Sequence, residues 1–453
     1  MYRFTSVTFL FLMGCAPTNP PAVGLVQDLI PGTEAANPHE LAVFDGDIYM
    51  YSNDGEFGSE LWRYDGLSLS RVTDLAPGEG SAAPAQLFVH EGDLYFTALL
   101  DETGRELLKL DGPSASVVGD INPGPTSSMP RDFQPMGSEV FFRANDGRLG
   151  FELWRMDDNE LSLAFDIEIG SGSSNPSQLT MFGDRLCFAA QTSTAGTELY
   201  CVTAKSLLLA ADLNPGPAGS GPNELTAFGE NLYFWAYRPD VGTELFRFDG
   251  EDVLLVTDLN PGEASSSPRG LTVWKDALFF AASNGVAGSE LWRLDLAAGS
   301  GAVPTMVTDL HPGPGSSAPY GFTEFGEALY FAAGDPQSGV ELRRTDGNQV
   351  SLVTDINSGP ADSEPTGFVV IQNRLYFSAR DEANGAELRS SDGVSTALMM
   401  DIWVGPVGSN PSEMTEAPGN QVCFSASAPD SGREFYCLPM NFGAPEPQET
   451  PAS

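Results

Sequence analysis

The stretch Glu60-Leu61-Trp62-Arg63-Tyr64-Asp65-Gly66 decides the fold, because its opening Glu-Leu-aromatic pattern returns along the whole chain with variation mainly in the third residue. A second marker, Asp-(Leu/Ile)-x-x-Gly, keeps the same spacing from Asp28 to Asp401. Repeat periods of 40–50 residues are typical of propeller blades and solenoid turns. The sequence therefore predicts one repeated domain over residues 25–438. The nine copies of the first pattern begin, at steps of 46, 46, 46, 46, 46, 51, 46 and 47 residues, at Glu60, Glu106, Glu152, Glu198, Glu244, Glu290, Glu341, Glu387 and Glu434.

Each unit contains four short runs with strand character. In the second unit these runs are 86–90, 93–98, 106–110 and 117–121, and Gly, Asp and Pro separate them. Apolar and β-favouring residues bounded by turn residues indicate strands, and Gly-Asp or Asp-Gly pairs indicate hairpin turns. Helical periodicity is absent from the sequence. The unit is therefore predicted to be a four-stranded blade, and the fold class to be all-β.

The two ends of the array complement one another. The chain enters the repeat at residues 25–30, which match a fourth strand, and the last unit stops after its third strand at 434–438. Pairing of these two segments would give every blade four strands and leave no bare outer edge. We therefore predict a single β-propeller of nine four-stranded blades, closed by the N-terminal strand. An eight-bladed ring with a displaced unit and an open arc are the alternatives.

Two positions fourteen residues apart change together. In seven units the first position is aromatic, and the second is basic in six of these. In the other two units both positions are cysteine, so the two residues are predicted to face each other across the second and third strands, as cation–π or stacking pairs or as disulfides. The alternative, zinc bound by four thiols, lacks the close ligand spacing of zinc sites. The predicted disulfides are Cys187 with Cys201 and Cys423 with Cys437.

The repeat resembles the bacterial ELWxxDGT (hyalin-like) repeat family over nearly the whole chain. Glu60 to Gly66 matches the family pattern closely, as do Glu152-Leu153-Trp154 and Glu290-Leu291-Trp292. No unit keeps the threonine after Asp-Gly, and some units, the fourth and ninth among them, lose Asp-Gly altogether. The resemblance implies an exported β-propeller and implies no particular reaction.

The N-terminal residues are predicted to be a targeting signal. Residues 4–13 are largely apolar, follow Arg3, and are too short to span a bilayer. The run Leu12-Met13-Gly14-Cys15 resembles the lipobox of bacterial lipoproteins, which implies a signal peptide over 1–14, lipidation of Cys15 and anchoring in the outer membrane, or a cell-surface or extracellular location. A plain secretory peptide is the alternative. Residues 15–24 are then a tether, and 439–453 a Pro-rich disordered tail.

The charge of the chain limits its partners. It carries 62 acidic and 22 basic residues, for a net charge of −40. Such a field repels phosphate backbones and anionic lipid headgroups, so nucleic acid is excluded and membrane contact is expected only through the lipid anchor. A protein or a polysaccharide of unknown identity is the expected partner.

Paired carboxylates are the candidate metal ligands. The Glu that opens each unit and the Asp fourteen residues later are expected to lie at the same end of a blade, where like charges need compensation. Backbone N–H groups and loop serine hydroxyls are one way to compensate them, and Ca²⁺ is another, because calcium prefers carboxylate oxygens in loops. The metal hypothesis, with Ca²⁺ as the cofactor, names Glu60 with Asp74, Glu106 with Asp120, and Glu152 with Asp166.

Residues that break the repeat are the candidate ligand-binding residues. Trp235, Tyr237 and Arg238 stand in the fifth unit where other units have smaller residues, and exposed aromatic residues suit sugar rings or protein hot spots. Core filling is the alternative for the aromatic residues. No catalytic motif is present, and the three histidines occupy non-equivalent positions. We therefore predict no enzyme but a non-catalytic exported lipoprotein that serves as a binding or structural scaffold at the cell surface. The alternative is an exported carbohydrate-active enzyme, a glycan hydrolase or lyase that uses carboxylates.

Overall fold

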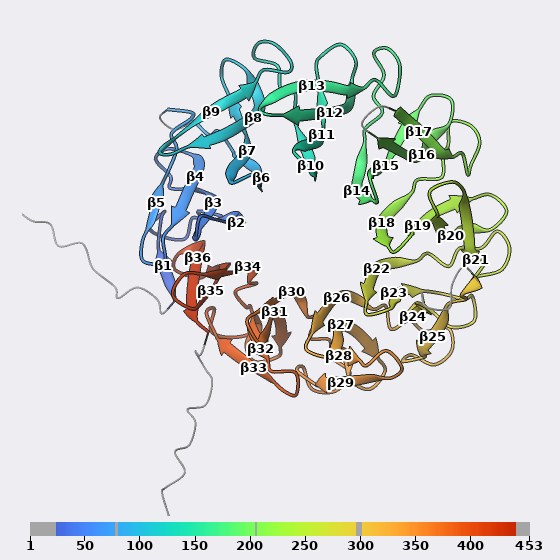
Figure 1. Cartoon of the computed structure of the whole chain (residues 1–453). Helices are drawn as coiled ribbons and strands as arrows, with labels where there is room; N and C mark the ends of the chain where they lie inside the picture. The colour runs from blue at the N-terminus through green and yellow to red at the C-terminus, as the bar shows by residue number, and fades with distance from the viewer. Residues whose placement is uncertain (1–23, 78–79, 204–205, 296–300, 441–453) are drawn as a thin grey trace, which may run out of the picture.

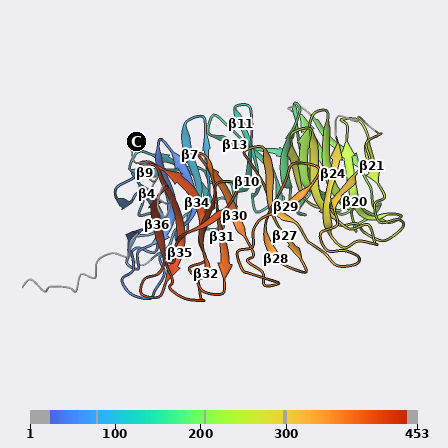
Figure 2. The ribbon, with the colours of Figure 1, turned by 90° about the horizontal axis from the view of Figure 1, so that it is seen from below.

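The chain forms a nine-bladed β-propeller, as the sequence predicts. The computed structural model describes residues 24–77, 80–203, 206–295 and 301–440. These residues form 36 strands and no helix, and the strands assemble into nine antiparallel sheets of four strands each. Figure 1 shows the sheets arranged around one axis, and Figure 2 shows the ring from its side as a flat disc. Along the described ranges, no helix long and apolar enough to cross a membrane is present.

We number the blades in chain order, starting after β1 (Leu25–Gln27). The first three blades contain β2 (His39–Phe44), β3 (Asp47–Asn53), β4 (Ser59–Tyr64) and β5 (Leu69–Arg71); β6 (Ala85–His90), β7 (Asp93–Leu100), β8 (Gly104–Asp111) and β9 (Ser114–Gly119); and β10 (Arg131–Met136), β11 (Glu139–Asn145), β12 (Phe151–Asp157) and β13 (Glu160–Phe165). The next three contain β14 (Ser177–Phe182), β15 (Arg185–Thr192), β16 (Gly196–Thr203) and β17 (Ser206–Ala211); β18 (Asn223–Phe228), β19 (Asn231–Arg238), β20 (Gly242–Phe248) and β21 (Val253–Thr257); and β22 (Arg269–Trp274), β23 (Ala277–Ala282), β24 (Glu290–Asp295) and β25 (Thr305–Thr308). The last three contain β26 (Tyr320–Phe325), β27 (Ala328–Asp335), β28 (Gly339–Thr345) and β29 (Val350–Thr354); β30 (Thr366–Ile371), β31 (Arg374–Asp381), β32 (Gly385–Ser391) and β33 (Thr396–Met400); and β34 (Ser412–Ala417), β35 (Gln421–Ala428) and β36 (Gly432–Pro439), with β1 as the fourth strand.

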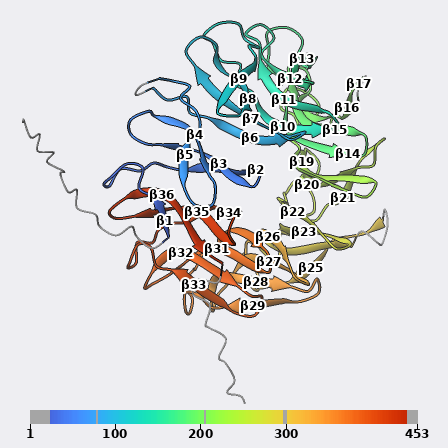
Figure 3. The ribbon, with the colours of Figure 1, turned by 60° about the vertical axis from the view of Figure 1, so that its left-hand side comes forward.

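The N-terminal strand closes the ring. β1 pairs antiparallel with β36, with Leu25 opposite Tyr436 and Gln27 opposite Phe435. Figures 1 and 3 show β1 beside β36, and the first strand of each blade nearest the centre of the ring. The outer edge of the last blade is thereby paired rather than left bare. The predicted closure is confirmed.

The predicted hairpin register is also confirmed. Tyr49 lies opposite Arg63, and Cys187 lies opposite Cys201. Both predicted disulfides form, between Cys187 and Cys201 and between Cys423 and Cys437. A cation–π contact of such a pair is found for Lys109 over the ring of Tyr95, at 5.9 Å. Arg63 pairs instead with Asp47, and Arg155 with Glu139, an acidic residue two positions before the aromatic residue of the pair.

The core lies between neighbouring blades. The middle strands carry the buried residues, and all six residues of β23 are buried. Phe182 of the fourth blade packs against Phe248 of the fifth, with ring centroids 5.8 Å apart. Each fully buried side chain of this size stabilises the fold by roughly 1.5–3 kcal/mol. Each blade contributes to two such layers, one with each neighbouring blade.

Candidate functional site

The repeated glutamates connect each blade, through hydrogen bonds, to the loop that leads to the next blade. All nine are fully buried. Glu152, for example, accepts hydrogen bonds from Ser174 Oγ at 2.6 Å, Ser174 N at 2.8 Å and Ile167 N at 2.8 Å. Charge-assisted hydrogen bonds of this kind compensate the desolvation of a carboxylate. Backbone N–H groups and serine hydroxyls are therefore the partners that these glutamates use.

Burial is the largest influence on the pKa values of these glutamates. It raises the pKa of Glu106 to about 7 and that of Glu434 to about 8, and hydrogen bonds only partly offset this effect. The charge of Asp120 adds to the rise in the pKa of Glu106, so the two carboxylates are close enough to repel one another. Burial also raises the pKa of Glu152, Glu198, Glu244, Glu341 and Glu387.

The calcium hypothesis stays a prediction. Within the described ranges, no group of three or more His, Cys, Asp or Glu residues is arranged to hold a metal ion. Asp120 Oδ2 accepts a hydrogen bond from Gly124 N at 3.0 Å, and Asp74 lies 3.9 Å from Arg71 Nη2. Asp120 and Asp74 therefore have protein partners, whereas Asp166 Oδ1 is buried with no hydrogen-bond partner among the described residues.

The three candidate ligand-binding residues of the fifth unit do not form one site. Trp235 and Tyr237 share one face of β19 and Arg238 lies on the other, because side chains alternate along a strand. Arg238 is held by Asp240, at 2.7 and 3.1 Å, and lies 5.5 Å from the ring of Phe246. Tyr237 is 41% exposed, whereas Trp235 is half-buried, and its ring N–H has no partner among the described residues.

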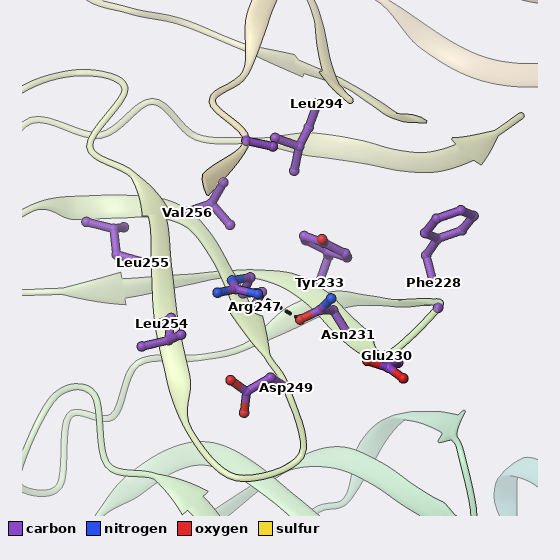
Figure 4. Close-up of a pocket in the computed structure, with 12 residues that line it drawn as sticks. Phe228, Glu230, Asn231, Tyr233, Arg247, Asp249, Leu254, Leu255, Val256 and Leu294 are labelled. Carbon is purple, nitrogen blue, oxygen red and sulfur yellow. Dashed lines mark hydrogen bonds between the residues drawn. The ribbon is translucent and has the colours of Figure 1, made fainter. Parts of the chain in front are cut away.

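A pocket of about 620 Å³ lies between the fifth and sixth blades. Figure 4 shows Arg247 in its middle, bonded to Asn231 Oδ1 at 3.0 Å, with Tyr233 on one side and Asp249 and Glu230 on the other. Burial raises the pKa of Tyr233, and backbone N–H groups of Asp252 and Glu251 lower the pKa of Asp249, with help from Arg247. Apolar walls complete the pocket, formed by Phe228, Leu254, Leu255, Val256, Leu294 and Ala302.

The seventh blade shows what the same two donors do elsewhere in the ring. Tyr330 and Arg344 are the counterparts of Tyr233 and Arg247, and both donate to the carbonyl oxygen of Gly393, at 3.1 and 2.7 Å. Gly393 belongs to the turn between the last two strands of the next blade. Arg293 likewise donates to Gly347 O at 3.0 Å. The Tyr-Arg pair is therefore a recognition site for an oxygen acceptor.

The counterpart of Gly393 in the sixth blade is position 296, which lies outside the described residues. The sequence did not predict this pocket. The signal was the step of 51 residues between Glu290 and Glu341, which marks the sixth blade as different from the others. A pairing argument restricted to one hairpin could not find it, since the acceptor comes from the neighbouring blade.

Comparisons with known proteins leave the family open. No family model matches the chain, and no curated protein matches it. The resemblance to the ELWxxDGT repeat family therefore stays a prediction. Solved structures that match include prolyl endopeptidases (11% identity, TM-score 0.43, 76% of this chain and 54% of that chain) and a puromycin hydrolase (12%, 0.38, 76% and 58%). A puromycin-hydrolysing peptidase of Mycobacterium tuberculosis also matches (12%, 0.39, 80% and 59%).

These matches correct the functional prediction. The three proteins are named as prolyl endopeptidases, a puromycin hydrolase and a puromycin-hydrolysing peptidase, so the prediction of a non-catalytic cell-surface scaffold, with its carbohydrate-active alternative, is withdrawn. At these identities and TM-scores the likeness itself shows a propeller fold alone. The chain spans less than two thirds of the length of these proteins. An enzymatic activity of this chain is thus not shown.

Proposed function

We propose that the chain recognises a small zwitterionic molecule, an amino acid or short peptide with an apolar side chain, in the pocket between the fifth and sixth blades. The observation that carries this proposal is the internal comparison of the Tyr-Arg pairs. In the seventh blade both donors converge on one carbonyl oxygen. In the fifth blade the same donors line a pocket.

The donors define the anionic end of the ligand. Arg247 Nη1 donates to Asn231, which leaves other N–H groups of its planar guanidinium for a ligand oxygen. A carboxylate fits this fork in the bidentate manner that arginine favours. The hydroxyl of Tyr233 adds a third donor to the same position.

The rest of the pocket defines the other groups of the ligand. Asp249 Oδ1 accepts two backbone N–H groups, so its Oδ2, together with Glu230, can accept from an ammonium group. Leu254, Val256 and Leu294 offer apolar surface beside the charged groups, and Val256 and Leu294 lie on the side of Arg247 away from Asp249 (Figure 4). Mostly apolar pockets with a few convergent polar groups are the usual form of small-molecule sites.

Calorimetric titration with leucine, phenylalanine and a leucine dipeptide tests the proposal. We expect measurable binding heat, and a loss of affinity of about tenfold or more in Arg247→Ala. The matched control is Arg344→Ala in the seventh blade, which removes a structural hydrogen bond but should leave affinity unchanged. No heat with any of the three compounds, or equal losses in both variants, would refute the proposal.

We also propose that the chain works outside the reducing cytoplasm, anchored through Cys15. Support comes from the two buried disulfides, since such bonds persist in oxidising compartments. Cys15 and the signal sequence lie outside the described residues. Cys15→Ser should move the protein from the membrane fraction to the soluble fraction of cells, and unchanged partitioning would contradict lipidation.

A further inference from the structure

A second pocket lies at the inner end of the eighth blade. Its volume is about 400 Å³, and it opens where the loop before β30 meets β31 and β32. Two neighbouring blades also contribute to it, the seventh through Tyr320 and the ninth through Asn410 and Pro411. The other lining residues are Ser363, Glu364, Thr366, Ser378, Arg380 and Ala386.

Two other blades fill the equivalent place with an arginine of their own. Arg105 in the second blade and Arg433 in the ninth each stand directly before the repeated glutamate, as Ala386 does in the eighth. Arg105 Nη1 donates to Ala83 O at 2.8 Å and to Thr97 Oγ1 at 3.4 Å. Both guanidinium groups are sheltered from solvent, and burial lowers the pKa of each.

The ninth blade holds its guanidinium in the same way. Arg433 Nη1 donates to Asn410 O at 3.1 Å, and Nη2 donates to Ser412 Oγ at 2.5 Å and to Ser425 O at 3.1 Å. Neither Arg105 nor Arg433 has a carboxylate within salt-bridge distance among the described residues. We call the oxygen atoms that accept from each of these guanidinium groups the cradle. The cradle therefore consists of a loop carbonyl oxygen and of hydroxyl or carbonyl oxygens of the neighbouring strands.

The eighth blade keeps the acceptors of this cradle without its arginine. Glu364 occupies the position of Ala83 and Asn410, and Ser378 that of Thr97 and Ser425. Thr366 occupies the position of Ser412. Ala386 has no atoms beyond Cβ to reach these oxygens, and the pocket lies in the place that the longer side chains of Arg105 and Arg433 fill.

We infer that the pocket of the eighth blade binds a guanidinium group, supplied by an arginine side chain of a partner peptide or protein. The geometry of the two internal copies defines the ligand, because the fold itself places guanidinium groups against these acceptors twice. The carboxylate of Glu364 stands where the copies have Ala83 and Asn410, while in the copies the negative charges of Glu40 and Glu413 act on Arg105 and Arg433 from other positions.

The electrostatics of the pocket agree with a cationic ligand. Burial, followed by the charges of Glu364 and Asp362, raises the pKa of Tyr320 to about 12. Arg380 Nη1 lies 3.2 Å from Glu364 Oε2, but both side chains are 54% exposed, so this ion pair contributes little. Arg380 lies opposite Ala386 across the strand pair, so an incoming guanidinium must displace Arg380 from Glu364, and the exposed Arg380 side chain then turns to solvent, which separates the two like charges. This site is separate from the pocket of the fifth blade and does not depend on it.

The test compares N-acetyl-arginine amide with its neutral citrulline analogue and with N-acetyl-lysine amide, by calorimetry on the purified chain. We expect binding heat with the arginine compound and no binding heat with the citrulline compound. Lysine should bind more weakly, because an ammonium group lacks the planar fork. No binding of the arginine compound would overturn the inference.

Ala386→Arg is the decisive variant, because it should fill the pocket with its own guanidinium as Arg105 and Arg433 do. We expect it to fold and to lose affinity for the arginine compound by about tenfold or more. Thr243→Arg, the same substitution at the equivalent position of the fifth blade, should leave affinity unchanged. If Ala386→Arg does not fold, Glu364→Gln provides the readout, with a loss of affinity expected. Equal affinity in wild type and Ala386→Arg, or an unchanged affinity in Glu364→Gln, would refute the site.

Discussion

The carboxylate of Glu434 accepts a hydrogen bond from the backbone N–H of Ala36 at 3.2 Å, across 398 residues of sequence. It also accepts from Leu29 N at 3.4 Å. At the position of Ala36, seven other units have a serine whose hydroxyl donates to the repeated glutamate, and Glu60 receives a hydroxyl from Thr73 instead. Burial raises the pKa of Glu434 to about 8, and the charge of Asp28 adds to the rise. Glu434 is the one glutamate of the nine without a hydroxyl donor among the described residues, so only the backbone N–H groups of Leu29 and Ala36 offset this effect.

Ala36→Ser should supply the missing donor. Because the added hydroxyl stabilises the ionised carboxylate, we expect the pKa of Glu434 to fall and the free energy of unfolding at pH 8 to rise by about 1–2 kcal/mol. Chemical denaturation at pH 8 measures the gain. Ser128→Ala is the converse control, and should raise the pKa of Glu106 above its present value of about 7. A loss of stability in Ala36→Ser at pH 8 would contradict this account.

Glu434→Gln should flatten the pH dependence of stability. The folded-state pKa of about 8 lies above the ordinary pKa of 4.5 for a glutamate, so the folded chain binds more protons than the unfolded chain between these values. The contribution of this group is fully present below pH 4.5 and is lost as the pH rises through 8. Unfolding free energies at pH 5, 6, 7 and 8 should therefore fall less steeply in the variant, by on the order of a few kcal/mol over the range. Parallel profiles would show that Glu434 is ionised throughout.

Arg343 takes the place that tryptophan has in other blades. Trp62 Nε1 donates to Ser52 O at 3.0 Å and Trp292 Nε1 to Ala282 O at 2.8 Å, whereas Arg343 Nε donates to Ala333 O, the equivalent carbonyl, at 2.9 Å. Arg343 also pairs with Asp335 at 2.5 Å. A tryptophan and an arginine at this position therefore donate a hydrogen bond to the same backbone carbonyl oxygen.

Both variants lose the ion pair with Asp335, whose carboxylate keeps the backbone N–H groups of Gln337 and Ser338 as partners. Arg343→Trp should keep the hydrogen bond to Ala333 O, whereas Arg343→Leu leaves that carbonyl without a donor, so we expect Arg343→Leu to be less stable than Arg343→Trp by about 1–3 kcal/mol. Denaturant titration of the two variants side by side tests the comparison. If both variants lose the same amount, the hydrogen bond to Ala333 is not what the position requires.

Removal of the disulfide in the fourth blade should destabilise the ring. Cys187 and Cys201 are both buried, so in Cys187→Ala/Cys201→Ala we expect a loss of roughly 2–4 kcal/mol from the free energy of unfolding, mainly through a freer unfolded chain. Wild type unfolded under reducing conditions should approach the double variant. A variant as stable as the oxidised wild type would show that the covalent bond is dispensable.

The ring was predictable from the sequence because its determinants are local and repeated. The repeat period predicted the length of one blade. The pair Tyr49 and Arg63 is replaced in the fourth unit by Cys187 and Cys201, and this joint change predicted the hairpin register. The complementary ends set the closure by β1. Each of these inferences concerns residues that are neighbours in one blade or whose partner the repeat itself identifies.

The candidate sites were less predictable because they depend on contacts between blades. Trp235 and Arg238 are close in sequence but lie on opposite faces of β19, so these residues, which break the repeat, do not form one ligand-binding site. The cradles of Arg105 and Arg433 need a loop carbonyl 22 or 23 residues earlier, and no local motif marks such a carbonyl. Ala386 is visible as a site only once those cradles are known.

Deletion of the closing strand should open the ring. Without residues 24–27, Cys437 N loses its bond to Gly24 O, at 2.8 Å, and β36 presents a bare edge that can pair with another chain. We expect a lower melting temperature, a broader transition and dimers or larger species in size-exclusion chromatography. Deletion of residues 441–453 is the control and should leave the monomer unchanged, because β36 ends at Pro439. A monomer with wild-type melting after loss of β1 would mean that interblade packing alone holds the ninth blade in place.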